Sequence, residues 1–187
     1  LGWSLFSEVF GKSLNIFIEN GNLIKKMSFP KITLPLIVTG NALVNNILLF
    51  GAILVVFGIL GHIPSLHLLW LPVLVIATLA LSLGLGLMLG ILNVFIRDIG
   101  QVIPIILQFW FWLTPIVYVA NTLPEEYRKF FYYNPMTGII EGYQNILVYN
   151  KPIDITTLIY PIALASITML LALFMYFRAN EEMADAL

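Results

Sequence analysis

Long uncharged apolar runs dominate the chain. They cover residues 34–60, 67–94, 100–119 and 155–177, and none contains Lys, Arg, Asp or Glu. The hydrocarbon core of a bilayer is about 30 Å thick and needs about 20 apolar helical residues. Each run therefore predicts a full transmembrane helix. Continuous runs also disfavour a transmembrane β-barrel, whose strands alternate between apolar and polar positions.

Residues 1–18 form a shorter apolar run that carries two charges, Glu8 and Lys12. Their spacing of four residues allows an ion pair on one face of a helix. Because the chain begins with Leu1 inside this run, we expect the tail of a fifth span, with the preceding N-terminal part absent.

The distribution of basic residues predicts the orientation. Cytoplasmic loops of membrane proteins carry an excess of Lys and Arg. The predicted spans place residues 19–33 and 178–187 on one side and residues 121–154 on the other. The first side is richer in positive charge, so we expect it to be cytoplasmic, in one transmembrane domain over residues 1–187. Its basic residues are Lys25, Lys26, Lys31, Arg97 and Arg178, with Lys12 nearby, against Arg128, Lys129 and Lys151.

Composition supports this fold class and excludes others. Hydrophobic residues make up 60% of the 187 positions and charged residues only 10%, whereas soluble domains average about 25% charged. The absence of Cys excludes a disulfide scaffold. Nine basic against ten acidic residues argue against nucleic-acid binding. We expect an all-α integral membrane protein surrounded by lipids.

The cytoplasmic segment 19–33 contains a candidate docking helix. Asn20, Gly21 and Asn22 are typical of a turn or an N-cap, and Pro30 ends any helix over Leu23–Ser28. One interpretation is a lysine anchor at the membrane surface. The alternative is a short helix that inserts into a groove on a soluble partner.

Amides and aromatic rings inside the runs are candidates for a transport path. Asn41 and Asn45 share a helical face, and buried amides require either a hydrogen-bond partner or water. Phe109 and Trp112 also share a face, which leaves Trp110 to one side. These rings, with Tyr118, form either an interfacial aromatic belt or a surface on which sugar rings stack.

Two further patterns each allow a structural and a functional interpretation. Ser82, Gly86 and Gly90 form a row of small residues, which predicts close helix packing within the chain or a seam between two copies. Arg97 and Asp98 follow a predicted span. They predict either an ion pair that caps a helix or a contact that transmits movement from a partner.

The outer segment 121–154 is long and apolar for a connector. Asn134 and Pro135 predict a turn that divides it into two short helices. Because the segment is apolar, we expect both helices to dip back into the outer leaflet. Non-helical backbone at that depth is tolerated only inside protein.

Four motifs together resemble the permease subunits of type-2 ABC exporters, within the branch that exports polysaccharide, O-antigen and teichoic acid. They are N-x-x-L-I-K-K-x-x-F-P before L-P-L, N-V-F-I-R-D-I at Asn93–Ile99, F-W-L-T-P-I-V-Y at Phe111–Tyr118, and Y-N-P-M-T-G-I-I-E-G-Y at Tyr133–Tyr143. The resemblance covers essentially the whole chain. Such permeases have six spans per subunit, so this chain would lack the first span and part of the second.

The resemblance implies roles for several residues. It implies a homodimer whose coupling helices contact separate ATPase subunits, with ATP and Mg bound by those partners. It also implies re-entrant gate helices around Tyr133, Asn134 and Pro135. The coupling residues would be Asn22, Leu23, Ile24, Lys25, Lys26, Phe29 and Pro30.

No catalytic or nucleotide-binding motif is present. The chain lacks G-x-x-x-x-G-K-[ST], and His62 and His67 are its only histidines, with no acidic neighbours in sequence to complete a metal site. We therefore expect no cofactor on this chain. The expected function is a permease of the bacterial inner membrane that exports a lipid-linked glycan. The alternatives are an exporter of drugs or lipids and, less well supported, a membrane-embedded glycan-processing enzyme.

Overall fold

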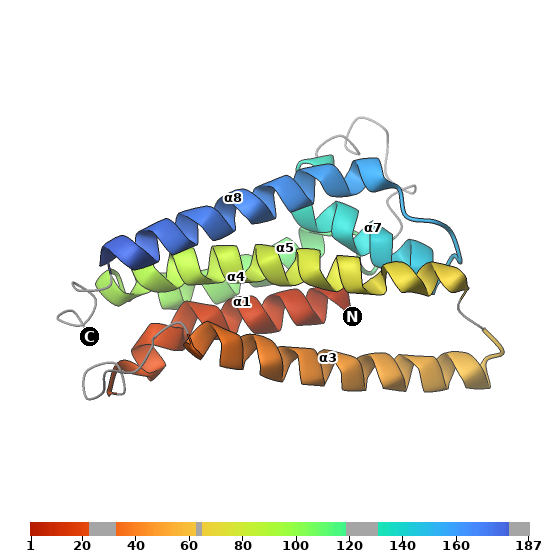
Figure 1. Ribbon diagram of the computed structural model, residues 1–187, viewed down its shortest axis with the longest axis horizontal. Helices are drawn as coiled ribbons and strands as arrows, with labels where there is room; N and C mark the ends of the chain where they lie inside the picture. Colours follow the sequence, from red (N-terminus) through yellow and green to blue (C-terminus); the bar gives the residue numbers. More distant parts are fainter. Residues whose placement is uncertain (23–32, 63–64, 119–130, 180–187) are drawn as a thin grey trace.

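The computed structural model describes residues 1–22, 33–62, 65–118 and 131–179, which form a bundle of elongated helices (Figure 1). No strand occurs within these ranges. The elements are α1 (Gly2–Glu19), α3 (Thr33–Ile59), the 3-10 helix η1 (Leu66–Trp70), α4 (Leu71–Phe95), α5 (Ile99–Leu113), α7 (Pro135–Leu147) and α8 (Ile155–Ala179).

Three helical stretches are long and apolar enough to cross a membrane. They are α3, the stretch Leu66–Phe95 formed by η1 and α4, and α8. The shortest, α8, has 25 residues, and a rise of 1.5 Å per residue gives it roughly 38 Å. The all-helical membrane fold is therefore confirmed at this level.

The prediction of four full spans is not confirmed, because α5 is shorter than residues 100–119. It has 15 residues and ends at Leu113, which gives roughly 22 Å against the about 30 Å of a bilayer core. The next residue, Thr114, turns its hydroxyl back onto the Trp110 carbonyl at 2.8 Å. Pro115 follows and has no N–H to continue the helix.

Helix α1 occupies the centre of the bundle and contacts α3, α4, α5 and α7. Its closest approach is to α4, through the row of small residues. A Cβ on Gly90 would lie 2.6 Å from the Ser13 carbonyl oxygen, and one on Gly86 would lie 2.7 Å from the Ser13 Cβ. The row therefore serves close packing within the chain, in agreement with the first of its two interpretations.

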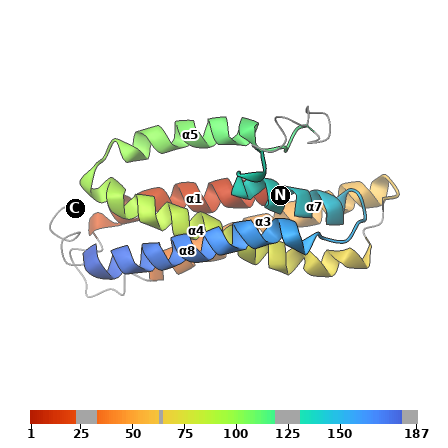
Figure 2. The same cartoon turned by 90° about the horizontal axis from the view of Figure 1, so that it is seen from above.

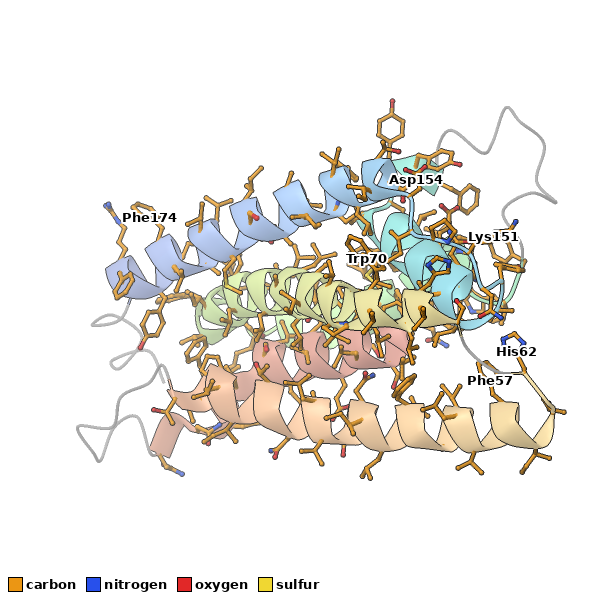
Figure 3. All side chains as sticks on the ribbon, turned by 45° about the vertical axis from the view of Figure 1, so that its right-hand side comes forward. Phe57, His62, Trp70, Lys151, Asp154 and Phe174 are labelled. Carbon is orange, nitrogen blue, oxygen red and sulfur yellow. The ribbon has the colours of Figure 1, made fainter. Side chains whose placement is uncertain are left out.

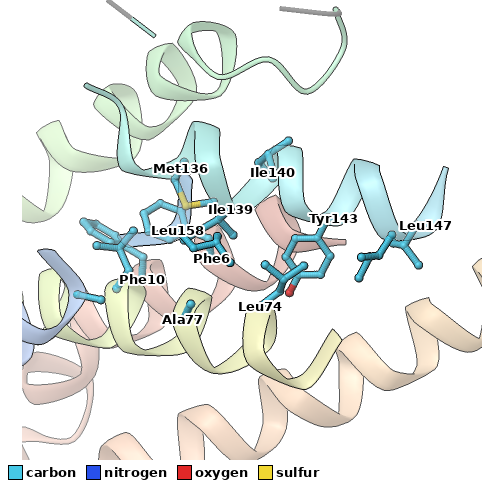
Figure 4. Packing of buried hydrophobic residues seen from close by; sticks show 13 residues of the cluster. Phe6, Phe10, Leu74, Ala77, Met136, Ile139, Ile140, Tyr143, Leu147 and Leu158 are labelled. Carbon is cyan, nitrogen blue, oxygen red and sulfur yellow. The ribbon is translucent and has the colours of Figure 1, made fainter. Parts of the chain in front are cut away.

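Helix α7 closes one end of the bundle with an apolar face. Met136 and Ile139 are fully buried and belong to the same cluster as Phe6 of α1 and Leu74 of α4 (Figure 4). Gly138 permits the approach of α7 to α8, because any Cβ there would overlap the Thr157 carbonyl oxygen.

The loops at this end are tied to α7. The His62 ring lies 2.9 Å from the Leu147 carbonyl oxygen, and the Ser65 N–H donates to the Asn150 side chain at 3.0 Å. Figure 3 places His62, Lys151 and Asp154 at this end and Phe174 at the opposite end. The turn between α4 and α5, which holds Arg97, lies at the end of α8 that carries Arg178 (Figure 1). The end that faces the cytoplasm stays a prediction.

Candidate transport path

Asn45 joins α3 to a pair of charges on α1. Its Nδ2 donates to Glu8 Oε1 at 2.7 Å, and the Lys12 ammonium donates to the same oxygen at 2.7 Å. Asn41 lies one turn earlier on α3 and is exposed. Asn45 thus makes an interhelical hydrogen bond while remaining on the surface of the chain. This position is compatible both with a structural contact between helices and with a place on the transport path.

Asn46 makes a second polar contact between α3 and α1. It is 7% exposed and donates to the Leu1 carbonyl at 3.3 Å. Sequence reasoning assigned this residue no separate role. It lies one turn after the fully buried Ala42, on the side of α3 that faces α1, and is therefore the buried member of the pair, whereas Asn45 is exposed.

The aromatic residues of α5 divide into two groups, as helical spacing predicts. Phe109 and Trp112 are 65% and 62% exposed. Trp110 instead packs against α1, with its ring centroid 5.2 Å from Phe6 and 6.4 Å from Trp3. Trp110 is therefore a packing residue, and the two exposed rings are available to lipid, substrate or another chain.

A groove of about 440 Å³ lies between α1 and α5, which run side by side in Figure 2. Trp112 lines it, whereas Phe109 does not. The groove therefore separates the two rings that the sequence assigned to one lining. Its walls are Trp3, Ser7, Pro104, Leu107, Gln108, Phe111 and Trp112.

Asn134 connects the end of α5 to the start of α7. Its Oδ1 caps α7 by accepting from the Met136 N–H at 3.0 Å and also accepts from Trp110 Nε1 at 2.8 Å. Its Nδ2 donates to the Leu113 carbonyl and to the Thr114 hydroxyl, at 3.3 and 2.9 Å. The carbonyls freed where α5 ends are thus satisfied by side chains of α7, which also supplies Gln144 to the Pro115 carbonyl at 2.9 Å.

The other predicted outer residues lie around this junction. Pro135 is the first residue of α7, so a helix does begin at the predicted break. Tyr133 is 75% exposed, and its carbonyl accepts from the Tyr160 hydroxyl at 3.0 Å. The Tyr118 hydroxyl donates to the Trp112 carbonyl at 3.1 Å. The first of the two expected short helices falls mainly on residues 119–130, which lie outside the described residues.

The turn between α4 and α5 differs from the ion pair that the sequence suggested. Arg97 and Asp98 are both exposed, and no salt bridge joins them in the described part of the chain, where the one pair is Glu8–Lys12. The Asp98 side chain makes no capping bond at the start of α5. The interpretation of these two residues as a capping ion pair is therefore wrong, and the alternative, a contact that transmits movement from a partner, stays a prediction.

Asn93 performs the capping that was assigned to Asp98. It is 1% exposed, and its Oδ1 accepts from the Gly100 N–H at 2.8 Å. Its Nδ2 donates to the Leu14 carbonyl at 3.1 Å and to the Asn15 Oδ1 at 3.3 Å. The sequence signal that could have indicated this role of Asn93 is its position: it is an amide in the last turn of a predicted span and the first residue of N-V-F-I-R-D-I.

The predicted coupling residues are only partly within the structure. Asn22 is exposed just after α1, while Leu23, Ile24, Lys25, Lys26, Phe29 and Pro30 lie outside the described residues. Their role stays a prediction.

Over the described ranges, no group of three or more His, Cys, Asp or Glu side chains could hold a metal ion. The polar groups instead lie between apolar helices and along an exposed groove. The three long apolar helices indicate a multi-pass membrane protein.

Comparison with known proteins identifies the family. The family model "ABC-2 type transporter" matches residues 1–148, so the chain belongs to this family of membrane subunits. Three relatives carry the name O-antigen export system permease protein RfbA. The one from Myxococcus xanthus is 28% identical over 189 residues, covering all of this chain and 73% of its own length.

The two relatives from Klebsiella pneumoniae are 29% and 27% identical over 150 and 155 residues. Each alignment covers 78% of this chain and 57% of the relative. These names confirm the predicted resemblance to the O-antigen branch of type-2 ABC permeases.

Proposed function

We propose that this chain is a permease subunit of an ATP-driven exporter that moves a polysaccharide across the bacterial inner membrane. The observation that carries the proposal is membership of the ABC-2 type transporter family together with relatives named as O-antigen export permeases. The chain itself performs transport, and ATP with Mg is bound by a separate ATPase subunit.

The substrate is a lipid-linked glycan. An exported sugar polymer requires a path with hydrogen-bonding groups and aromatic faces, since sugar C–H groups pack on rings and sugar hydroxyls need polar partners. The exposed residues Asn41, Asn45 and Trp112 supply both kinds of group, and the exposed Phe109 adds another ring.

A complete path needs a second copy of the permease. In one copy, α3 and α5 expose large apolar side chains along their length, and the groove beside Trp112 is open and not enclosed. We propose a homodimer in which two such surfaces enclose one path, with gate residues Tyr133, Asn134 and Pro135 near its exit.

Coupling to the ATPase occurs through Asn22 and the residues up to Pro30. Two reversals of charge, Lys25→Glu and Lys26→Glu, test this role in one variant. We expect the variant to insert and to lose export while ATP hydrolysis continues. Normal export would refute the coupling role.

The test of function is export in a strain that makes the cognate glycan but lacks its own permease. The permease carrying this sequence is expressed with its ATPase, and surface glycan is measured by immunoblot on intact cells. We expect surface glycan with the active ATPase and intracellular accumulation with an ATPase that cannot hydrolyse ATP. If the glycan stays inside the cells with either ATPase and the cells become more resistant to drugs, the chain is instead a subunit of a drug exporter.

A further inference from the structure

A polar pocket of about 240 Å³ lies between the start of α7 and the first two turns of α8. It shares no lining residue with the groove between α1 and α5. Figure 3 places Asp154, which directly precedes α8, at this end of the bundle. The polar residues that line the pocket are Tyr132, Asn134, Thr156, Thr157 and Tyr160.

Three of the four hydroxyls in this pocket already use their hydrogens. Thr156 donates to Asp154 Oδ1 at 2.6 Å, and Thr157 donates to the Asp154 carbonyl oxygen at 2.8 Å. Tyr160 donates to the Tyr133 carbonyl oxygen at 3.0 Å. Carboxylate and carbonyl oxygens can only accept, so each hydroxyl must be the donor and keeps only lone pairs for a ligand. The pocket therefore favours a ligand that donates hydrogen bonds.

The charge beside the pocket is negative. The Thr156 hydroxyl and N–H hold the pKa of Asp154 below its ordinary value, so this carboxylate is ionised at neutral pH. Burial raises the pKa of Glu141 on α7, and the nearby charge of Asp154 raises it further. Within the described ranges, no basic side chain forms a salt bridge with either carboxyl. A donor with a positive charge fits this environment better than a neutral one.

Two phenol rings adapt the pocket to an organic cation. Tyr132 and Tyr160 are 53% and 44% exposed, and both line the pocket. Aromatic faces attract ammonium groups. The volume of about 240 Å³ is below the about 300–1,000 Å³ of pockets for drug-sized ligands. The occupant is therefore a small ammonium group and not an oligosaccharide.

The pocket lies at the level of lipid headgroups. Helix α8 is long and apolar enough to cross a membrane, and its first two turns, from Thr156 to Pro161, line the pocket. Residues Ile167 and Leu171 follow on the same face of α8, because steps of three and four residues return to one side of a helix. Their side chains are 54% and 47% exposed. This face thus provides a polar pocket followed by an apolar surface for acyl chains.

We propose that this pocket binds the primary ammonium of a phosphatidylethanolamine headgroup in the leaflet at this end of the bundle. The hydroxyl oxygens of Thr156, Thr157 and Tyr160 accept its three N–H bonds, and the Asp154 carboxylate beside Thr156 supplies the opposite charge. A trimethylammonium headgroup has no N–H to donate, so the site discriminates against phosphatidylcholine. The inference goes beyond the proposed function and holds for any exported substrate.

The first test measures lipid binding to the permease purified with its ATPase, by native mass spectrometry. Phosphatidylethanolamine and phosphatidylcholine with identical acyl chains are titrated separately. We expect the first phosphatidylethanolamine to bind with a dissociation constant at least about tenfold lower, because hydrogen bonds from a charged donor are the strong ones. Equal dissociation constants for the two lipids would overturn the inference.

Two variants locate the site. Asp154→Asn removes the charge but keeps an oxygen that can cap α8, and Thr157→Val removes a hydroxyl while preserving the shape of the side chain. Each should weaken phosphatidylethanolamine binding at least about fivefold and leave phosphatidylcholine binding unchanged. The matched controls are Asp98→Asn, an exposed carboxyl at the other end of the bundle, and Ser166→Ala, an exposed hydroxyl further along α8. Unchanged binding in both pocket variants would place the lipid elsewhere.

The second test measures the thermal midpoint of the same complexes, because a ligand that binds only the folded state stabilises it. Phosphatidylethanolamine should raise the midpoint of the wild type, and this shift should be absent in Asp154→Asn. Free glucosamine carries the same ammonium on a sugar and should not displace the lipid. If glucosamine displaces it at an equal concentration, the pocket is a site for amino sugars and the assignment to a lipid is wrong.

Discussion

At the scale of single residues, one buried amide holds three parts of the chain together. Asn93 lies in the last turn of α4 and binds the backbone of α1 at Leu14 and that of α5 at Gly100. These contacts fix the turn that carries Arg97 and Asp98, which themselves form no ion pair in the structure. The amide is nearly inaccessible to solvent, so nothing can replace its bonds when it is removed.

We expect Asn93→Ala to destabilise the folded protein by about 1–2 kcal/mol, because it removes two hydrogen bonds to α1, of about 0.6 kcal/mol each in membrane proteins, and the cap on Gly100. The measurement is the midpoint of thermal unfolding in detergent, followed by size-exclusion chromatography. Asn41→Ala removes an exposed amide from α3 and should leave the midpoint unchanged. Equal midpoints for both variants would contradict the role of Asn93.

The start of α8 has a pH-dependent cap. The Thr156 hydroxyl and N–H, at 2.6 and 2.9 Å, hold the pKa of Asp154 below its ordinary value of 3.8. A carboxyl whose folded-state pKa is lowered stabilises the fold above its ordinary pKa, and that contribution is lost as the pH falls through the lowered value. The Asp154→Asn variant lacks this carboxyl. Its free energy of unfolding should therefore fall less than that of the wild type as the pH drops below about 4. A steeper profile for the variant would contradict this assignment.

At the scale of elements, the packing of α1 on α4 depends on the absence of side chains at Gly86 and Gly90. Backbone atoms of α1 occupy the space that a Cβ would need, and backbone cannot rotate away as a side chain can. The two helices thereby approach closely enough for extensive van der Waals contact, which is the main source of helix association in lipid.

Gly90→Ala should therefore separate α1 from α4 and destabilise the protein by about 1–3 kcal/mol, the usual range for overpacking. Gly51→Ala on α3 is the matched control, since a Cβ there meets nothing within 4 Å. It should be neutral or slightly stabilising because alanine has the higher helix propensity. Thermal midpoints of the two variants provide the comparison, and a neutral Gly90→Ala would show that the helices can shift without loss.

The junction of α5 and α7 is a second element-scale feature, and it depends on the contact between Trp110 and Asn134. A double-mutant cycle with Trp110→Phe and Asn134→Ala measures their coupling. We expect a coupling energy of about 0.5–1.5 kcal/mol, since Trp110→Phe removes the indole N–H while retaining a ring. Strict additivity of the two substitutions would show that the hydrogen bond contributes nothing to the junction.

At the scale of the whole molecule, α3, α4 and α8 run from one end of the bundle to the other and separate two sets of loops (Figure 1). The basic residues favour the end with Arg97 and Arg178 as cytoplasmic. The opposite end carries His62 and Lys151 (Figure 3). This orientation can be measured, because both ends expose residues suited to single-cysteine labelling.

An impermeant maleimide added to intact spheroplasts should label Lys151→Cys. It should label Arg97→Cys only after the membrane is permeabilised. Both native side chains are exposed in the chain, so the difference would report sidedness and not burial. The reverse pattern would invert the topology and place the coupling segment outside the cell.

The sequence alone determined the fold class and the general positions of the membrane helices, because uncharged runs of more than 20 residues leave few alternatives in lipid. It also separated Trp110 from Trp112, since helical periodicity is a local property. Motif order indicated the family before any comparison. The sequence did not determine where α5 ends, because that end is stabilised by Asn134 and Gln144, whose side chains donate hydrogen bonds to the carbonyls of Leu113 and Pro115.

Only the tertiary structure decided which polar residues meet. Asn93 and Asn45 act through partners on α1 that are 79 and 37 positions away in the chain. The Glu8–Lys12 pair appears in the sequence as a local ion pair. That Glu8 also meets Asn45 of α3 follows from how the helices pack around α1, and no single helix contains that information. Local spacing fixes the face on which a residue lies, whereas contacts between helices decide whether that face meets protein, lipid or a path.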